Sequence, residues 1–354
     1  MRPLGPTECI SPAIARTKDF LARPFRLGTY LKLAAVAFFA EVGGGSCNFT
    51  SPGGNHSRTT SQAFPHQLPD FASVGVLLAI AIVAVVIGLI LFYVGSRLQL
   101  VLVEMVAARQ QYVTPFWRKQ GPATWSWIGL KLLFFFAMMA VMLVLALPLI
   151  FYFVHHHWGP GSFGGHWVAI VLIVTASLVA LLLLGLAYML LRNFAAPPIA
   201  LEDVSLSEAF RRARAIFELE PGAVTGFLLL QLVLIIAFAI AAEILLLIVV
   251  LLSLIPFGIV GGLAWFALHQ ARKAGMVVLI SFLVMLGTIF LAWTICVAIA
   301  LLGPVYVFNQ AYALYFLGGR YPLLGSLLDQ SEPPPYGMLN LTPPVPPIIP
   351  PNPA

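Results

Sequence analysis

The sequence predicts an all-α integral membrane protein, with six transmembrane helices and both chain ends in the cytoplasm. Three observations predict this fold class: the composition, the lengths of the apolar runs and the distribution of basic residues. Of the 354 residues, 60% are hydrophobic and 9% are charged, whereas soluble domains carry about 25% charged residues. Such a chain lacks the polar residues that cover a soluble exterior, so we expect its exterior to face lipid.

Six apolar runs are candidate transmembrane helices, because crossing the hydrocarbon core takes about 20 apolar residues. The first run is the weakest, since it contains Lys32 and Glu41. The runs predict a cytoplasmic amphipathic segment at 1–27, a membrane domain at 28–320 and a disordered Pro-rich cytoplasmic tail at 321–354. The predicted spans are about 28–44, 71–95, 127–154, 167–191, 224–253 and 275–302.

The basic residues set the orientation, because cytoplasmic segments of membrane proteins carry the excess of Lys and Arg. With the N-terminus inside, 16 of the 19 basic residues fall in inner segments, and Arg58, Arg272 and Lys273 fall outside. The reverse orientation would place most of the positive charge outside. We therefore expect both termini at the inner face of a cytoplasmic membrane.

A further apolar stretch, 257–268, is twelve residues long and too short to cross the bilayer. We interpret it as an interfacial or re-entrant segment. The alternative, that it crosses, would move the C-terminus outside and is disfavoured by its length.

Three inner segments share one order of features: a short amphipathic helix, a proline, a few polar residues and then a span. Their central residues are Lys32, Lys131 and Gln231, with spacings of 99 and 100 residues. Each unit would hold two spans, so the units would be parallel repeats. Chance similarity between apolar segments is the alternative, but the spacing and the shared order favour a repeat. At the inner edge, Lys131 and Gln231 are expected to extend their polar ends to the interface.

The third amphipathic helix is the best defined of the three. Ser205 and Glu208 match a capping box, and an apolar stripe with helical spacing follows. A basic amphipathic helix beside a span lies at the inner headgroup layer, where anionic lipids attract it. Anchoring is the favoured role, and lipid sensing is the alternative. The residues of the stripe are Leu206, Ala209, Phe210, Ala213, Ile216 and Phe217.

Two carboxylates inside predicted spans are candidate functional residues, because burying an ionisable group in lipid is costly. Glu243 lies roughly 18 Å beyond Gln231, and Glu41 lies roughly 14 Å beyond Lys32. At similar depths, they could face a common cavity that binds a cation, a proton or an amine. The alternatives are that Glu243 is protonated and hydrogen-bonded to a neighbouring helix, and that Glu41 marks the aqueous end of a short span. For Glu41 the alternative is favoured.

An outer loop contains His155, His156, His157 and His166. Imidazoles at this density can bind zinc or copper. The loop has no carboxylate or cysteine to complete a familiar ligand set, and incidental histidines are the favoured interpretation. We expect no cofactor.

The remaining sequence features point away from catalysis and nucleic-acid binding. The sequence contains no Walker A loop, G-x-S-x-G or H-E-x-x-H motif, and no Lys/Arg-rich stripe of the kind that binds nucleic acid. The segment 333–354 contains ten prolines and predicts a polyproline-like extension. A protein partner could dock on this tail, although an inert tail is the default expectation.

Two segments carry a resemblance to a known family. They are residues 15–33, which include Arg23-Pro24-Phe25-Arg26, and residues 306–317. Both resemble a family of uncharacterised prokaryotic multi-span membrane proteins, distantly similar to the membrane domain attached to some glycerophosphodiester phosphodiesterases. The resemblance implies about six helices in a bacterial or archaeal cytoplasmic membrane. The catalytic barrel of those enzymes and its acidic metal-binding motifs have no counterpart here, so the resemblance implies no catalytic residues.

The sequence therefore favours a non-catalytic membrane organiser or accessory protein. A transporter or channel that uses Glu243 is the first alternative, and a metal-dependent membrane enzyme that uses the histidines is the second.

Overall fold

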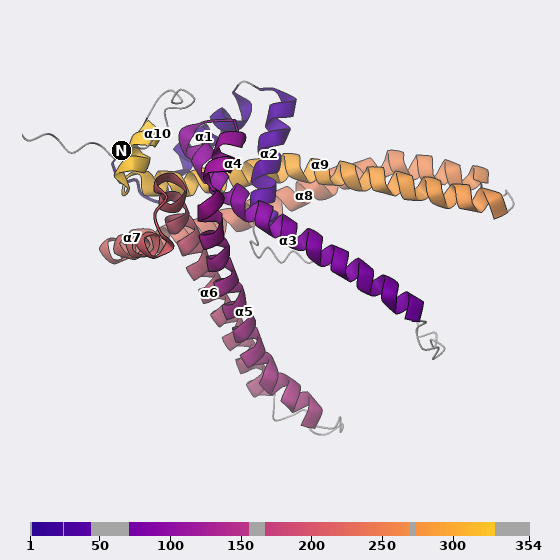
Figure 1. The fold of residues 1–354 in the computed structure, drawn as a ribbon, viewed down its shortest axis with the longest axis horizontal. Helices are drawn as coiled ribbons and strands as arrows, with labels where there is room; N and C mark the ends of the chain where they lie inside the picture. Colours follow the sequence, from indigo (N-terminus) through magenta and orange to yellow (C-terminus); the bar gives the residue numbers. More distant parts are fainter. Residues whose placement is uncertain (1, 24, 44–70, 156–166, 269–272, 330–354) are drawn as a thin grey trace, which may run out of the picture.

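The structure is a computed structural model that describes residues 2–23, 25–43, 71–155, 167–268 and 273–329 (Figure 1). The described chain is all-helical and contains no strand. The helices are α1 (Ile10–Ala22), α2 (Leu27–Val42), α3 (Phe71–Ala108), α4 (Thr114–Lys119), α5 (Gly121–His155), α6 (Trp167–Glu202), α7 (Leu206–Leu219), α8 (Pro221–Leu268), α9 (Lys273–Gly318) and α10 (Pro322–Asp329).

Five of the described helices are long and apolar enough to cross a membrane, and they indicate a multi-pass membrane protein. These helices are α3, α5, α6, α8 and α9. The 16 residues of α2 rise about 24 Å, less than the roughly 30 Å of a hydrocarbon core. The predicted count of six spans therefore stays a prediction.

The segment 257–268 is not a separate element, so the expectation of a re-entrant segment was wrong, whereas a position at the membrane interface stays a prediction. Helix α8 continues through Pro256 and ends at Leu268. A proline removes one helical hydrogen bond, but a chain in lipid has no water to satisfy its backbone and therefore tends to stay helical. In this outer part, the rings of Phe257 and Phe290 lie 5.0 Å apart, so α8 still packs on α9.

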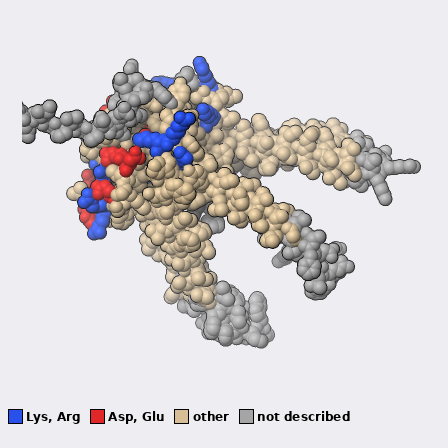
Figure 2. Space-filling model, in the orientation of Figure 1, with Lys and Arg blue, Asp and Glu red and all other residues tan. Residues whose placement is uncertain are grey.

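The long helices form three arms that extend in different directions from one body (Figure 1). Helices α8 and α9 run side by side, α5 and α6 form a second pair, and the first half of α3 extends alone. We call these outer helical parts the arms. The arms are apolar, and the Lys, Arg, Asp and Glu side chains visible in Figure 2 gather on the body.

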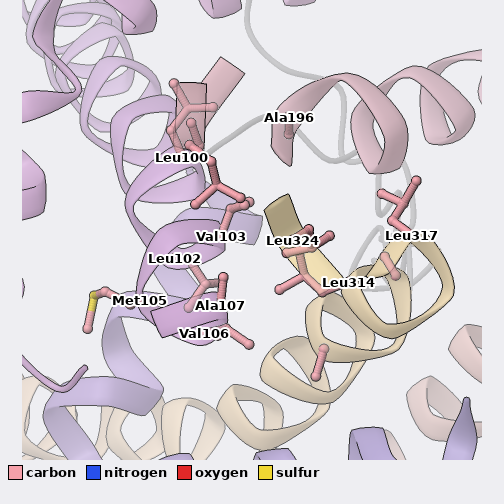
Figure 3. Packing of buried hydrophobic residues seen from close by; sticks show 14 of the residues in the cluster. Leu100, Leu102, Val103, Met105, Val106, Ala107, Ala196, Leu314, Leu317 and Leu324 are labelled. Carbon is pink, nitrogen blue, oxygen red and sulfur yellow. The ribbon is translucent and has the colours of Figure 1, made fainter. Parts of the chain in front are cut away.

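The body consists of the short helices together with the C-terminal turns of α3, α6 and α9. These three helix ends contact one another in pairs, and their side chains from 98–108, 191–201 and 307–317 form most of the buried apolar core. Figure 3 shows Leu100 and Val103 of α3 facing Leu314 and Leu324 of the C-terminal helices. Each of these three long helices is thus exposed in its first part and buried in its last.

The remaining helices pack around these ends in a regular order. Helices α1 and α2 pack on α9, helices α4 and α5 pack on α3, and helices α7 and α8 pack on α6. The second and third groups therefore each rest on the long helix that precedes them in the chain. The first group, α1 and α2, rests on the last long helix, α9.

The contact between α2 and α9 depends on a glycine. A Cβ added at Gly303 would lie 2.5 Å from Cβ and 2.6 Å from Cα of Ala34. Both distances are shorter than any van der Waals contact between carbon atoms. Only a residue without a side chain allows the two helices to approach this closely.

Candidate functional site

A set of polar side chains connects different helix pairs at the level where the exposed arms pass into the buried body. We call this set the polar cluster. Every long helix contributes to it, and its contacts join helices that are distant in sequence. Its members are Glu41 of α2, Ser96 and Gln99 of α3, Trp127 and Lys131 of α5, Arg192 and Asn193 of α6, Gln231 of α8 and Asn309 of α9.

An ion pair between Glu41 and Arg192 joins α2 to α6. The two side chains are 4% and 13% exposed, respectively. The expectation that Glu41 marks the aqueous end of a short span was therefore wrong. Two charges removed from water stabilise each other only when they remain paired, so this contact fixes the end of α2 against α6.

Glu243 lies on the exposed surface of α8, in the arm. Among the described residues, none forms a hydrogen bond or ion pair with it. The structure therefore does not bring Glu243 and Glu41 together in a shared polar site. Whether Glu243 has a function stays a prediction.

Lys131 is 5% exposed and lies between α5 and α3. Its Nζ donates a hydrogen bond to Oγ of Ser96 (3.2 Å) and lies 5.9 Å from the ring centroids of Phe92 and Trp127. Nearby, Nε1 of Trp127 donates to Oε1 of Gln99 (3.0 Å). The expectation that Lys131 extends to the interface was wrong, because the packing of α5 on α3 encloses the whole side chain.

Gln231 connects three helices through its side-chain amide. Nδ2 of Asn193 donates to Oε1 of Gln231 (2.6 Å), and Nε2 of Gln231 donates to Oδ1 of Asn309 (2.8 Å). Gln231 is 1% exposed, so the expectation that it extends to the interface was also wrong. Hydrogen bonds between membrane helices each contribute about 0.6 kcal/mol, and these two hold α6, α8 and α9 together.

Arg16 of α1 caps the C-terminal end of α3. Its guanidinium donates to the carbonyl oxygens of Val106 (3.0 Å) and Ala107 (2.5 Å), and the residue is 1% exposed. The last carbonyls of a helix lack partners within the helix and carry partial negative charge. A buried cation at this position therefore stabilises the helix end.

Glu104 forms a second buried connection inside the body. Its carboxylate accepts hydrogen bonds from Nζ of Lys119 and from Nε2 of Gln120, both at 2.7 Å, and Nε2 of Gln120 also donates to the carbonyl of Ala200 (2.8 Å). These contacts join α3, the end of α4 and the end of α6. The sequence analysis did not identify Glu104, although an acid within the apolar run 98–108 was a usable signal.

Helix α7 begins as predicted, since Oγ of Ser205 accepts a hydrogen bond from the backbone N–H of Glu208 (3.4 Å). Its apolar stripe is divided: Ala209 and Ala213 are buried on the body, whereas Phe210 and Phe217 are exposed. The small residues of the predicted stripe thus pack closely on α6, whereas its aromatic residues remain on the outer surface.

The charges of α7 are paired within the protein. The hydrogen bonds from Arg211 and then from Arg212 lower the pKa of Glu208 below its ordinary value. Conversely, the hydrogen bonds to Glu202 and Glu208 raise the pKa of Arg212. These partly exposed contacts orient α7 on the body.

The predicted metal site falls largely outside the described residues. His156, His157 and His166 are not described, and His155 is the last residue of α5. Among the described residues, no group of three His, Cys, Asp or Glu side chains could hold a metal ion. The metal site therefore stays a prediction.

The comparisons with known proteins give one match. A family described as "Family of unknown function (DUF7544)" matches residues 4–327. Comparison with curated proteins and with solved structures gives no match. The match agrees with the expected uncharacterised family, whereas the distant similarity to the membrane domain of glycerophosphodiester phosphodiesterases stays a prediction. The match covers nearly the whole chain, which therefore belongs to this family of unknown function.

Proposed function

We propose that the protein is a non-catalytic membrane organiser or accessory protein of the cytoplasmic membrane, which gathers lipids or partner membrane proteins around its arms. The observation that carries this proposal is the separation of its two regions. Polar contacts between helix pairs lie in and next to the body, whereas the arms expose apolar side chains.

The surfaces of the arms support a role in lateral contacts within the membrane. In α8, Leu247, Leu251 and Leu254 are 58%, 54% and 52% exposed. In α3, nearly every described side chain from 78 to 91 is exposed. Surfaces of this size must contact either lipid tails or other membrane helices, and three separate arms offer more of this surface than a closed bundle.

The proposed topology has six spans in three parallel units, with both termini in the cytoplasm. The order of packing supports it, because α4 with α5 and α7 with α8 rest on the preceding long helix, and α1 with α2 rest on the last one, α9. The excess of basic residues in the inner segments supports the orientation. In this proposal α2 is the first and shortest span.

The test uses native nanodiscs cut from the membrane with an amphipathic polymer. We expect the discs of the full chain to contain a lipid class or a membrane protein at a higher level than the bulk membrane. Replacing Leu247, Leu251 and Leu254 by alanine should reduce that enrichment, because it changes the surface of one arm. Discs with the composition of the bulk membrane would overturn the proposal.

A transporter is the second candidate, and the ion pair of Glu41 and Arg192 favours it. Charged residues among membrane helices often belong to transport pathways. In this alternative Glu41, rather than the exposed Glu243, is the acidic residue of the pathway. If vesicles that contain the purified protein show a solute flux that Glu41→Gln abolishes and Glu243→Gln retains, the transporter replaces the organiser as the proposed function.

A further inference from the structure

We propose that the turn between α1 and α2, with the residues beside it, binds the anionic phospholipid headgroups of the inner leaflet. This surface, which we call the basic edge, consists of Lys18, Arg23, Phe25, Arg26, Leu27 and Lys32. The inference rests on the proposed function and on the inward orientation of this end of the protein, and it names the lipid class that the organiser contacts.

The first argument is the balance of charge. Between residues 17 and 32, the exposed basic residues Lys18, Arg23, Arg26 and Lys32 face a single acid, Asp19. Residues 202–220, which contain α7, have five acids and three arginines. In Figure 2, Lys and Arg side chains project from the body near α1 and α2, whereas acidic and basic side chains mix near α7. An anionic surface therefore attracts the basic edge more strongly than it attracts α7.

The second argument is the pairing of these charges. The arginines of α7 form ion pairs of 2.6–3.0 Å with Glu202, Glu208 and Glu218. In contrast, among the described residues no acid lies within ion-pair distance of Lys18, Arg26 or Lys32. The pair of Arg23 with Asp19 (3.2 Å) involves an arginine side chain that is 82% exposed and is easily exchanged for a phosphate.

The third argument is the apolar part of the edge. Phe25, which lies between Arg23 and Arg26, is 65% exposed, and Leu27, which directly follows Arg26, is 71% exposed. Phe25 lies two residues before α2 and Leu27 is its first residue, so both lie where this helix would enter the bilayer. Exposed aromatic residues next to basic ones are typical of the headgroup layer. Tyr112, 64% exposed, extends this surface, because Nε2 of the preceding Gln111 donates to the carbonyl of Arg23 (3.1 Å).

The experiment compares two variants of the full chain that lose equal positive charge. The first is R23Q/R26Q/K32Q in the basic edge, and the matched control is R211Q/R212Q/R214Q in α7. Native mass spectrometry in a neutral detergent measures the ratio of bound phosphatidylglycerol to bound phosphatidylcholine. Circular dichroism and size-exclusion chromatography check that each variant is folded.

We expect the wild-type protein to prefer phosphatidylglycerol. In the basic-edge variant, the ratio of bound phosphatidylglycerol to bound phosphatidylcholine should fall about fivefold for each charge removed. The α7 variant should keep most of the preference, and R23K/R26K should keep it because the positive charge remains. Added salt should reduce it. A wild-type protein without the preference, or a preference lost in the α7 variant alone, would overturn the proposal.

This outcome is separate from that of the nanodisc experiment. Enrichment of a partner protein around the arms, without a preference for anionic lipid, would leave the organiser in place and remove the basic edge as a lipid site. A headgroup preference without any enrichment would remove the organiser instead.

Discussion

The body and the arms are built from the same long helices, yet they are stabilised differently. The last turns of α3, α6 and α9 are buried against one another and against the short helices. The first parts of these helices are apolar and exposed, and they contact at most one neighbouring helix over most of their length.

The difference shows where helix contacts gain free energy in lipid. Apolar side chains on an arm lose little favourable free energy when they contact lipid tails instead of a neighbouring helix, since both environments are equally apolar. A buried polar side chain loses its partner when the helices separate, because lipid offers no replacement. The polar cluster should therefore contribute more to holding the helix pairs together than the apolar surface of the arms does.

The largest expected effect comes from breaking the ion pair of the polar cluster. Arg192→Ala leaves the carboxylate of Glu41 buried without its cation, which typically costs about 3–5 kcal/mol. The double variant E41L/R192M removes both charges and should recover most of the lost stability. Unfolding of the purified protein by increasing SDS in mixed micelles measures both.

The control for this prediction lies in an arm. Leu247→Ala changes an exposed apolar side chain and should alter stability by about 0.5 kcal/mol or less. Equal losses in Arg192→Ala and Leu247→Ala would contradict the contrast between body and arms.

The second effect concerns the close approach of α2 and α9. Gly303→Ala places a methyl group against Ala34 and should destabilise the protein by about 1–3 kcal/mol, as overpacked sites do. Gly287→Ala is the matched control on the same helix, because a Cβ at Gly287 meets nothing within 4 Å. Thermal unfolding should show a lower midpoint for Gly303→Ala and an unchanged or higher one for Gly287→Ala.

Gln231→Leu should have a smaller effect. It removes the two amide hydrogen bonds with Asn193 and Asn309, at about 0.6 kcal/mol each. A double-mutant cycle with Asn309→Ala, measured by the same SDS unfolding, isolates the contact between α8 and α9. A coupling energy of zero would show that Gln231 fills space without stabilising the contact.

The sequence predicted the arms better than the body, for a physical reason. An apolar run of about 20 residues identifies a membrane helix by itself, and five predicted spans lie within described helices. The predicted spans ended near the first charge, however, at about 95 and 191. Helices α3 and α6 continue to Ala108 and Glu202, because the body replaces lipid as their apolar surroundings.

The partners within the polar cluster could not be predicted from one sequence. Glu41 and Arg192 are separated by 151 positions, and no local pattern links them. Arg192 was assigned to an inner segment and therefore offered no partner for a carboxylate inside a span. In contrast, the cap at Ser205 was predicted, because its partner lies three residues away.

The smallest expected effect is the response of α7 to acid. The hydrogen bonds from Arg211 and Arg212 lower the pKa of Glu208, so this contact stabilises α7 fully above the ordinary pKa of a glutamate. The stabilisation declines as the pH falls from that value towards the lower pKa of the folded state.

Hydrogen exchange at pH 7 and at pH 3, each corrected for the intrinsic rate, should show slightly weaker protection of α7 at the lower pH. Glu208→Gln should reduce this difference, because the glutamine does not titrate. The Glu208 side chain is 29% exposed, so water can replace its partners. Loss of protection throughout the body at pH 3 would instead indicate that a buried group, such as Glu104, takes up the proton first.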